Sequence, residues 1–211
     1  MQKRTRFVCA AAALAVVTLL QESPGAYLLH GSRWMRSTVD YHVNGANLDL
    51  AADAAIDAVR AGADTWAQQS GAAFAFRYAG TSALSTNTLD NTNLVSFRDA
   101  SSGSAIATAY WWSSGGAIVE ADILFWDGGF TFFAGSTGCS GGFYIEDIAA
   151  HEFGHALGLG HSTISGTTMY PSTSSCNVNP RSLHADDIAG ALALYPASAS
   201  PIAPSGLRIV R

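Results

Sequence analysis

The 211-residue sequence predicts an α+β domain built around one mixed β-sheet. Several short segments alternate apolar and polar residues, which is typical of strands, and three longer segments carry apolar residues at helical spacing. Their order along the chain is strand, helix, several strands, helix, helix. Hydrophobic residues make up 48% of the chain, enough for a full core, so a chain that is disordered throughout is excluded.

The charge balance limits the partners of this protein. Charged residues make up only 13% of the chain, and the net charge at pH 7 is −5. A nucleic-acid-binding face needs clustered basic residues, so we expect no nucleic-acid partner. No run reaches the roughly 18 apolar residues of a membrane-spanning helix, so we expect no membrane partner once the N-terminal segment has been removed.

That N-terminal segment has the pattern of a secretory signal peptide. Lys3, Arg4 and Arg6 precede an uncharged stretch, residues 7–20, that is rich in Ala, Val and Leu. A positive region followed by an apolar region of this length is typical of export, and it explains the charge order better than a buried N-terminal helix does. We therefore predict a signal peptide over residues 1–26 and a secreted protein, extracellular or periplasmic.

The mature chain opens with a strand and a helix. Residues 38–43 alternate apolar and polar side chains and predict the first strand. A helix follows, and Asn47 or Asp49 is the residue expected to cap its start. The helix runs to about Ser70, where Gly71 stops it.

Four more strands and two more helices complete the domain. The strands are predicted at residues 74–78, 94–98, 106–112 and 118–126, and the helices at residues 144–158 and 184–195. A glycine-rich loop, residues 128–142, precedes the second helix, and Pro196 stops the third. We assign residues 27–196 to one domain and residues 197–211, rich in Ala, Ser and Pro, to a flexible tail.

Two cysteines, Cys139 and Cys176, remain after the predicted signal peptide is removed. An even pair in an exported protein indicates one disulfide bond, because the compartment is oxidising. The alternative is two free buried thiols.

The chemistry lies in one motif, His-Glu-Phe-Gly-His-Ala-Leu-Gly-Leu-Gly-His, at residues 151–161. His151 and His155 are one helical turn apart, so both imidazoles project from the same face of the helix. Gly158 can take a positive φ, which ends the helix and lets His161 approach the same point. Three imidazole nitrogens suit Zn²⁺ and leave a fourth position for water, which is typical of a catalytic rather than a structural zinc site.

Glu152 is the predicted general base of this site. It points about 100° round the helix from the first histidine, beside the metal rather than onto it. In such a site the metal lowers the pKa of water toward about 7 and polarises the carbonyl that is attacked. We expect Glu152 to take the water's proton and to pass it to the leaving amine. The alternative, three histidines that only pack or face solvent, does not explain the full spacing of the motif.

The motif resembles that of the metzincins, whose long zinc signature is followed by a methionine turn. Met169 comes eight residues after His161, in the sequence Thr-Met-Tyr-Pro. Within that clan, His161-Ser162 and Met169-Tyr170-Pro171 are similar to the matrixins, the matrix metalloproteinase family. The resemblance implies that Met169 forms a hydrophobic floor beneath the zinc ligands.

The resemblance covers about residues 33–196, and it implies both the fold and the activity. It implies a twisted mixed five-stranded sheet with three helices and an active-site cleft, in a monomeric zinc endopeptidase that acts on extended polypeptide. In the family an acidic pair on the last helix anchors the methionine turn and the mature N-terminus, so Asp186 and Asp187 are expected to be structural. The alternative is that they are ordinary first-turn acids favoured by the helix dipole.

A matrixin-like fold also implies the outline of the cleft. Residues 106–112 would be an edge strand to which an extended peptide adds, and residues 171–173 would wall the pocket for the residue after the cut. Trp111 and Trp112 either rim the cleft or belong to the core. Asp147 either favours basic substrate side chains at the base of the pocket or only stabilises the first turn of its helix.

Calcium is a second candidate metal, through Asp127 and the carbonyl oxygens of residues 128–142. The histidines outside the motif are too scattered to predict a second zinc site.

Two other functions remain to be weighed against the endopeptidase. A non-catalytic module would use zinc only to brace the fold, but zinc binding needs the three histidines and not Glu152. A zinc peptidase that trims chain ends would need a pocket for a terminal charge, whereas the edge strand predicts an open groove.

Overall fold

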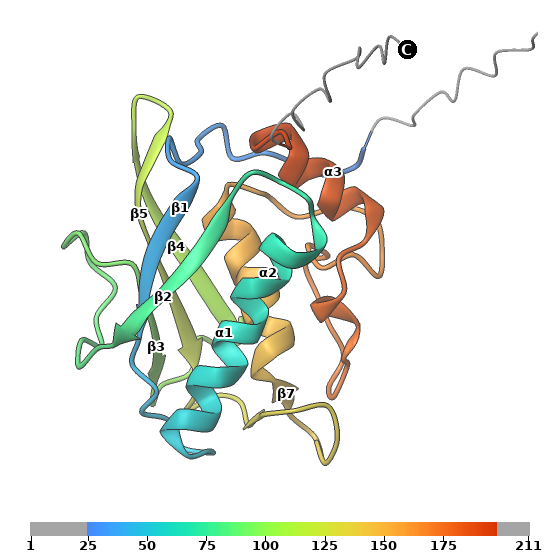
Figure 1. Ribbon diagram of the computed structural model, residues 1–211. Helices are drawn as coiled ribbons and strands as arrows, with labels where there is room; N and C mark the ends of the chain where they lie inside the picture. The colour runs from blue at the N-terminus through green and yellow to red at the C-terminus, as the bar shows by residue number, and fades with distance from the viewer. Residues whose placement is uncertain (1–24, 198–211) are drawn as a thin grey trace, which may run out of the picture.

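The computed structural model describes residues 25–197, which form a domain with a five-stranded mixed sheet and three helices (Figure 1). This confirms the predicted α+β class. The predicted signal peptide up to residue 24 and the predicted tail from residue 198 lie outside the described residues. The main elements are β1 Thr38–Val43, α1 Ala52–Gln69, β2 Ala75–Thr81, β3 Leu94–Arg98, β4 Ala107–Ser114, β5 Ala117–Trp126, α2 Ile145–Leu157 and α3 Ala185–Leu194.

The strand order in the sheet is β2-β1-β3-β5-β4. The neighbours from β2 to β5 are parallel, and β4 alone pairs antiparallel, through a hairpin with β5. The tight turn at Gly115 and Gly116 joins these two strands, as a glycine pair favours. The hairpin places β4 at the edge of the sheet, as expected, with one side free of any neighbouring strand of the sheet.

The helices α1 and α2 lie side by side against one face of the sheet, and α3 lies at one end of the domain (Figure 1). The buried face of α1 recurs every three or four residues and includes Val59 and Trp66. Full burial of such side chains stabilises the fold by about 1.5–3 kcal/mol each. The Trp66 indole Nε1–H donates to the Ala150 carbonyl of α2 at 2.8 Å, so the two helices are also joined by a hydrogen bond.

The start of α1 corrects the predicted cap. The residue before the helix is Ala51, and no side chain caps it. The Asn47 side-chain oxygen instead accepts the amides of Asp49 and Leu50, at 3.0 and 2.7 Å, in a local turn. The Asp49 carboxylate accepts the Phe132 amide at 2.7 Å, a contact across 83 residues that no local pattern indicates.

Two short strands were not predicted, β6 Phe132–Phe133 within the glycine-rich loop and β7 Phe143–Tyr144 directly after it, and they pair in parallel. Strands of two residues are too short to show any periodicity. A short 3₁₀ helix, η1 Asn179–Arg181, was not predicted either. The predicted disulfide is confirmed, and it joins Cys139 of this loop to Cys176, with the two Cα atoms 5.5 Å apart.

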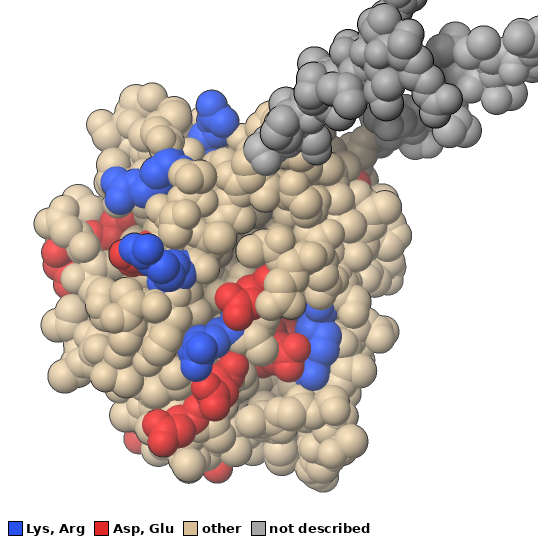
Figure 2. Space-filling view, viewed as in Figure 1, with Lys and Arg blue, Asp and Glu red and all other residues tan. Residues whose placement is uncertain are grey.

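The described residues carry no strong concentration of one charge on the face in view. Figure 2 shows arginine and acidic side chains beside one another on a surface that is mostly uncharged. Within residues 25–197, none of the helices has both the length and the apolar character needed to cross a membrane.

Candidate active site

The helix α2 carries the first two histidines of the motif, and its end is set by one glycine. Gly158 has a φ of +118°, which side chains other than glycine rarely adopt. Its amide contacts the carbonyls of Gly154 and His155, closing the last turn. A β-carbon at Gly158 would also meet the Ser32 carbonyl oxygen. The chain therefore turns back here, as predicted, and brings His161 to the face of α2.

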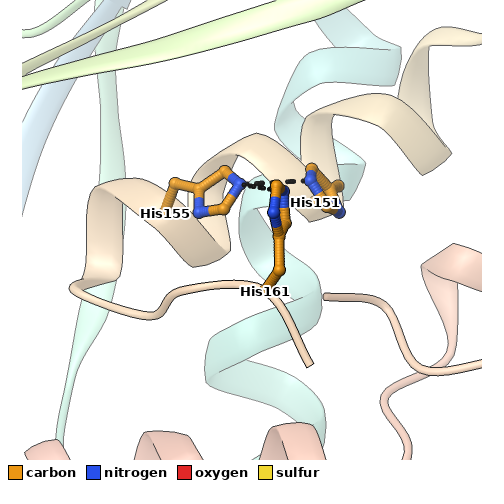
Figure 3. Close-up of side chains that lie close together, drawn as sticks. All are labelled: His151, His155 and His161. Atoms are coloured by element: carbon orange, nitrogen blue, oxygen red, sulfur yellow. Dashed lines mark hydrogen bonds between the residues drawn. The ribbon is translucent and has the colours of Figure 1, made fainter. Parts of the chain in front are cut away.

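The three imidazoles converge (Figure 3). The His155 Nε2 atom lies 3.1 Å from His151 Nε2 and 3.2 Å from His161 Nε2. Ligand nitrogens about 2.0–2.1 Å from a tetrahedral zinc ion are separated by about 3.3 Å. Within residues 25–197, these three histidines form the group of at least three His, Cys, Asp or Glu residues whose ligand atoms all lie within 4.8 Å of one another.

The partners of the other ring nitrogens decide which nitrogens can bind a metal. His151 Nδ1 lies 2.7 Å from the Thr168 carbonyl oxygen, and His155 Nδ1 lies 2.8 Å from that of Leu159. Carbonyl oxygens only accept, so both Nδ1 atoms carry the proton and both Nε2 atoms present a lone pair. Lone pairs that face one another at this distance repel unless a cation lies between them. The donor set therefore fits zinc.

Burial keeps these rings neutral. Burial, together with the smaller effect of the neighbouring imidazoles, lowers the pKa of His151 to about 4 and the pKa of His155 to about 3. Burial also lowers the pKa of the more exposed His161. Neutral imidazole is the form that binds zinc, so the pocket favours the binding-competent state at neutral pH.

Glu152 is only 5% exposed and lines the same cavity as the histidines. Burial raises its pKa to about 8, while a hydrogen bond from the Ala109 backbone of β4 acts in the opposite direction. A divalent cation beside the carboxylate favours its charged form. The edge strand thus orients the carboxylate that the sequence indicated as a base.

Met169 packs against α2, the helix that carries the first two histidines. It is 1% exposed and packs so closely on Gly154 of α2 that a β-carbon there would collide with its sulfur. The Asp187 carboxylate accepts the amides of Thr168 and Met169, at 2.9 and 3.1 Å. Since the Thr168 carbonyl binds the His151 ring, Asp187 positions a candidate metal ligand through the methionine turn.

Asp186 holds two segments that are distant in sequence. Its carboxylate accepts the amides of Ala26 and Tyr27, at 2.6 and 3.2 Å, and the Ser162 hydroxyl at 2.6 Å. Ser162 directly follows the third histidine. The structural role expected for the acidic pair is therefore confirmed.

The three histidines line a cavity of about 1110 Å³. One part of its lining is Ile106 to Ala109 with Trp111, from β4 and the residue before it, and another part is the loop from Pro171 to Ser174. Of the two tryptophans, Trp111 rims the cavity, and Trp112 is not among its lining residues. The predicted edge strand and pocket wall therefore both border the site.

His30 is a cleft residue that the sequence analysis did not single out. Its ring stacks on Trp111, with centroids 4.1 Å apart, and lies 5.6 Å from the His155 ring centroid. The segment that carries it pairs with the turn after α2, since the His30 amide donates to the Gly158 carbonyl at 2.9 Å. No local pattern around His30 indicates this position, because it depends on a pairing across more than 120 residues.

The structure gives Asp147 a structural role, through Arg181 of another segment rather than through the first turn of its own helix. Asp147 borders the cavity but is 1% exposed, and Arg181 binds it with its backbone amide and its guanidinium group. A carboxylate already paired in this way has little attraction left for a basic substrate side chain.

Calcium remains a prediction. The Asp127 carboxylate is 4% exposed, and one oxygen accepts the Leu48 amide at 2.6 Å. Its other oxygen has no hydrogen-bond partner among the described residues. Burial and the neighbouring carboxylates of Asp49 and Asp99 raise its pKa.

Curated proteins with similar sequences are matrix metalloproteinases. Neutrophil collagenase of Homo sapiens is 44% identical over 70 residues, 33% of this chain and 15% of that protein. Matrix metalloproteinase-20 of Homo sapiens is 50% identical over 54 residues, 26% and 11% of the two chains. Matrilysin of Mus musculus is 53% identical over 47 residues, 22% and 18%. The chain thus spans less than a fifth of the length of each of these relatives.

The family model described as matrixin, the M10 peptidases, matches residues 33–196. This range contains the whole sheet, the three helices, the converging histidines and the methionine turn. The recognised resemblance is confirmed over most of the chain, and the protein belongs to the matrixin family.

Proposed function

We propose that residues 27–196 are the catalytic domain of a secreted zinc endopeptidase. The observation that carries this proposal is the convergence of three imidazole Nε2 atoms beside a buried glutamate in an open cleft. Membership of the matrixin family supports the same reaction.

His151, His155 and His161 are the proposed zinc ligands. Their protonated Nδ1 atoms, where they are bonded to carbonyl oxygens, leave Nε2 free to bind the metal. When bound, zinc supplies Lewis acidity, which lowers the pKa of water toward about 7 and polarises the substrate carbonyl.

Glu152 is the proposed general base and acid. Its carboxylate is buried against β4 and shielded from bulk solvent. Few other waters therefore compete with the attacking water for this carboxylate, which accepts the proton of the attacking water. The same carboxyl group then delivers the proton to the leaving amine. The Ala109 backbone of β4 lies beside this carboxylate and lines the same cavity.

The proposed substrate is an extended polypeptide that adds to the free edge of β4. Main-chain pairing recognises polypeptide in general, and the loop from Pro171 to Ser174 faces the side chain that points away from the strand. The N-terminal charge pattern supports secretion, and we propose that the domain acts as a monomer.

The test pairs zinc analysis with hydrolysis of casein or gelatin by wild type and Glu152→Gln. We expect equal zinc content in both proteins and a loss of hydrolysis of about 10²–10⁴-fold in the variant, because only the proton transfer is removed. Asp64→Asn, an exposed change of the same kind on α1, is the control and should keep wild-type activity.

A wild type that binds one zinc ion and cleaves no protein or peptide would support the non-catalytic zinc-braced module instead. Peptides with blocked termini separate the endopeptidase from an enzyme that trims chain ends. Cleavage of both blocked and free peptides at internal bonds is the expected result, and cleavage of free peptides alone would reject the endopeptidase.

A further inference from the structure

The loop that follows the methionine turn, residues 170–183, is tied to the segment before α2 at two separate points. Apart from the short η1 it has no regular structure of its own. Ordering a free loop costs backbone entropy at every residue, so a loop of this kind needs tertiary contacts to keep one shape.

The first tether is the Cys139–Cys176 disulfide. Beside it, the Gly142 carbonyl accepts the Cys176 amide at 2.9 Å and the Ser175 hydroxyl at 3.1 Å. Cys176 has a φ of +58°, a left-handed conformation that is unfavourable for a residue with a β-carbon. These contacts hold the middle of the loop in a shape that it would not adopt alone.

The second tether is Arg181, near the end of the loop. Its guanidinium group binds the Asp147 carboxylate and lies 3.0 Å from a Glu146 carboxylate oxygen. It also donates to the Gly135 carbonyl at 3.2 Å and lies over the Tyr144 ring. One side chain thus joins the loop to both the glycine-rich loop and the first turn of α2.

Residues of both tethered segments line the cavity. Phe143 and Ile148 line it from the β7–α2 side, and Thr173, Asn177 and Pro180 line it from the loop. The width of the cavity between these residues is therefore the distance between two segments that the tethers hold together.

We propose that Cys139, Cys176 and Arg181 are positioning residues that fix the loop as one wall of a substrate side-chain pocket and thereby set substrate selectivity. The inference rests on the proposed endopeptidase function. The pocket takes one side chain of an extended peptide, and the tethers limit the size of that side chain.

The test uses the Cys139→Ser/Cys176→Ser double variant and three peptides that differ only in the residue after the cleaved bond: alanine, leucine or tryptophan. We expect the leucine-to-tryptophan ratio of kcat/KM to fall at least about fivefold, because an untied wall accommodates the bulkier ring. The alanine peptide and the zinc content should stay within about twofold of wild type, since a small side chain does not reach the loop. An unchanged ratio, or an equal loss for all three peptides, would overturn the proposal.

A second readout separates this proposal from the proposed function. Hydrogen exchange of the amides of residues 174–177 should speed up at least about tenfold in the double variant, and it can be measured on wild type and variant whether or not either cleaves a peptide. A wild type that cleaves none of the peptides would reject the endopeptidase, and unchanged exchange would reject the tether.

If the double variant does not fold, Arg181→Lys cuts part of the second tether with the disulfide in place. Lysine keeps the charge but lacks the planar donors that bind Asp147 at two points. We expect the selectivity ratio to fall about twofold to threefold. Arg60→Lys, in an exposed ion pair on α1, is the matched control and should leave the selectivity ratio unchanged. A selectivity ratio of Arg181→Lys equal to that of this control would overturn the proposal.

Discussion

Buried aspartates lie on two sides of this domain, and the two groups differ in their hydrogen bonding. Around α2 and α3, both oxygens of Asp147, Asp186 and Asp187 accept hydrogen bonds from amides, a hydroxyl or an arginine. On β5 and just after it, Asp122 and Asp127 each keep one buried oxygen without a partner among the described residues.

The difference shows where buried charge organises the site and where it is only tolerated. The paired group holds the methionine turn, the residue after the third histidine and the pocket loop. On β5, burial and the nearby Glu120 and Asp90 raise the pKa of Asp122 to about 7. Asp122 should therefore destabilise the fold when it is charged.

The largest expected effect comes from breaking the paired side with Arg181→Gln. This change leaves the Asp147 carboxylate buried without its cation, which costs about 3 kcal/mol. Urea unfolding measures the loss. Arg77→Gln removes the exposed pair with Asp40 and should change the midpoint by no more than the error of the measurement. Equal losses of stability in Arg181→Gln and Arg77→Gln would contradict the difference expected between the buried and the exposed ion pair.

A second, smaller effect is expected from Asp187→Asn. The amide group replaces one of two acceptor oxygens, so at least one of the amide donors at Thr168, Met169 and His184 loses its partner. The free energy of unfolding should fall by about 2 kcal/mol. Zinc affinity should fall about 10-fold or more, because the turn positions the His151 ring. Unchanged zinc affinity with lowered stability would mean that Asp187 braces only the fold.

The smallest effect, of opposite sign, is expected from Asp122→Asn. The side-chain oxygen can still accept the Leu94 amide, while the buried charge and its repulsion from Glu120 disappear. We expect the free energy of unfolding to rise by about 1 kcal/mol at pH 8.

The pH dependence of this gain follows from the direction of the shift. The pKa of Asp122 is raised from 3.8 to about 7 in the folded protein, so the folded state holds the proton more tightly. The stabilisation that comes from protonated Asp122 is complete below about pH 4 and is lost as the pH rises toward 7. The advantage of asparagine should therefore vanish near pH 4. A constant or reversed difference from pH 4 to pH 8 would contradict the assignment.

The local chemistry of the site could be predicted from the sequence because it follows from spacing along one chain segment. Two histidines one turn apart share a helix face whatever surrounds them, and Gly158 permits the turn that returns His161. The same holds for β3, predicted at residues 94–98 and found there, and for the α+β class. The disulfide was also predicted, because two cysteines in an exported chain offer one pairing.

Contacts between distant segments were decided only by the tertiary structure. Asn47 closes a turn instead of capping α1, and the Asp49 carboxylate accepts the Phe132 amide instead of capping that helix. Asp147 is committed to Arg181, 34 residues away, and His30 reaches the cleft through a pairing with the turn after α2. Periodicity and spacing report on neighbours along a helix or strand, whereas these partners are set by how the packed elements meet.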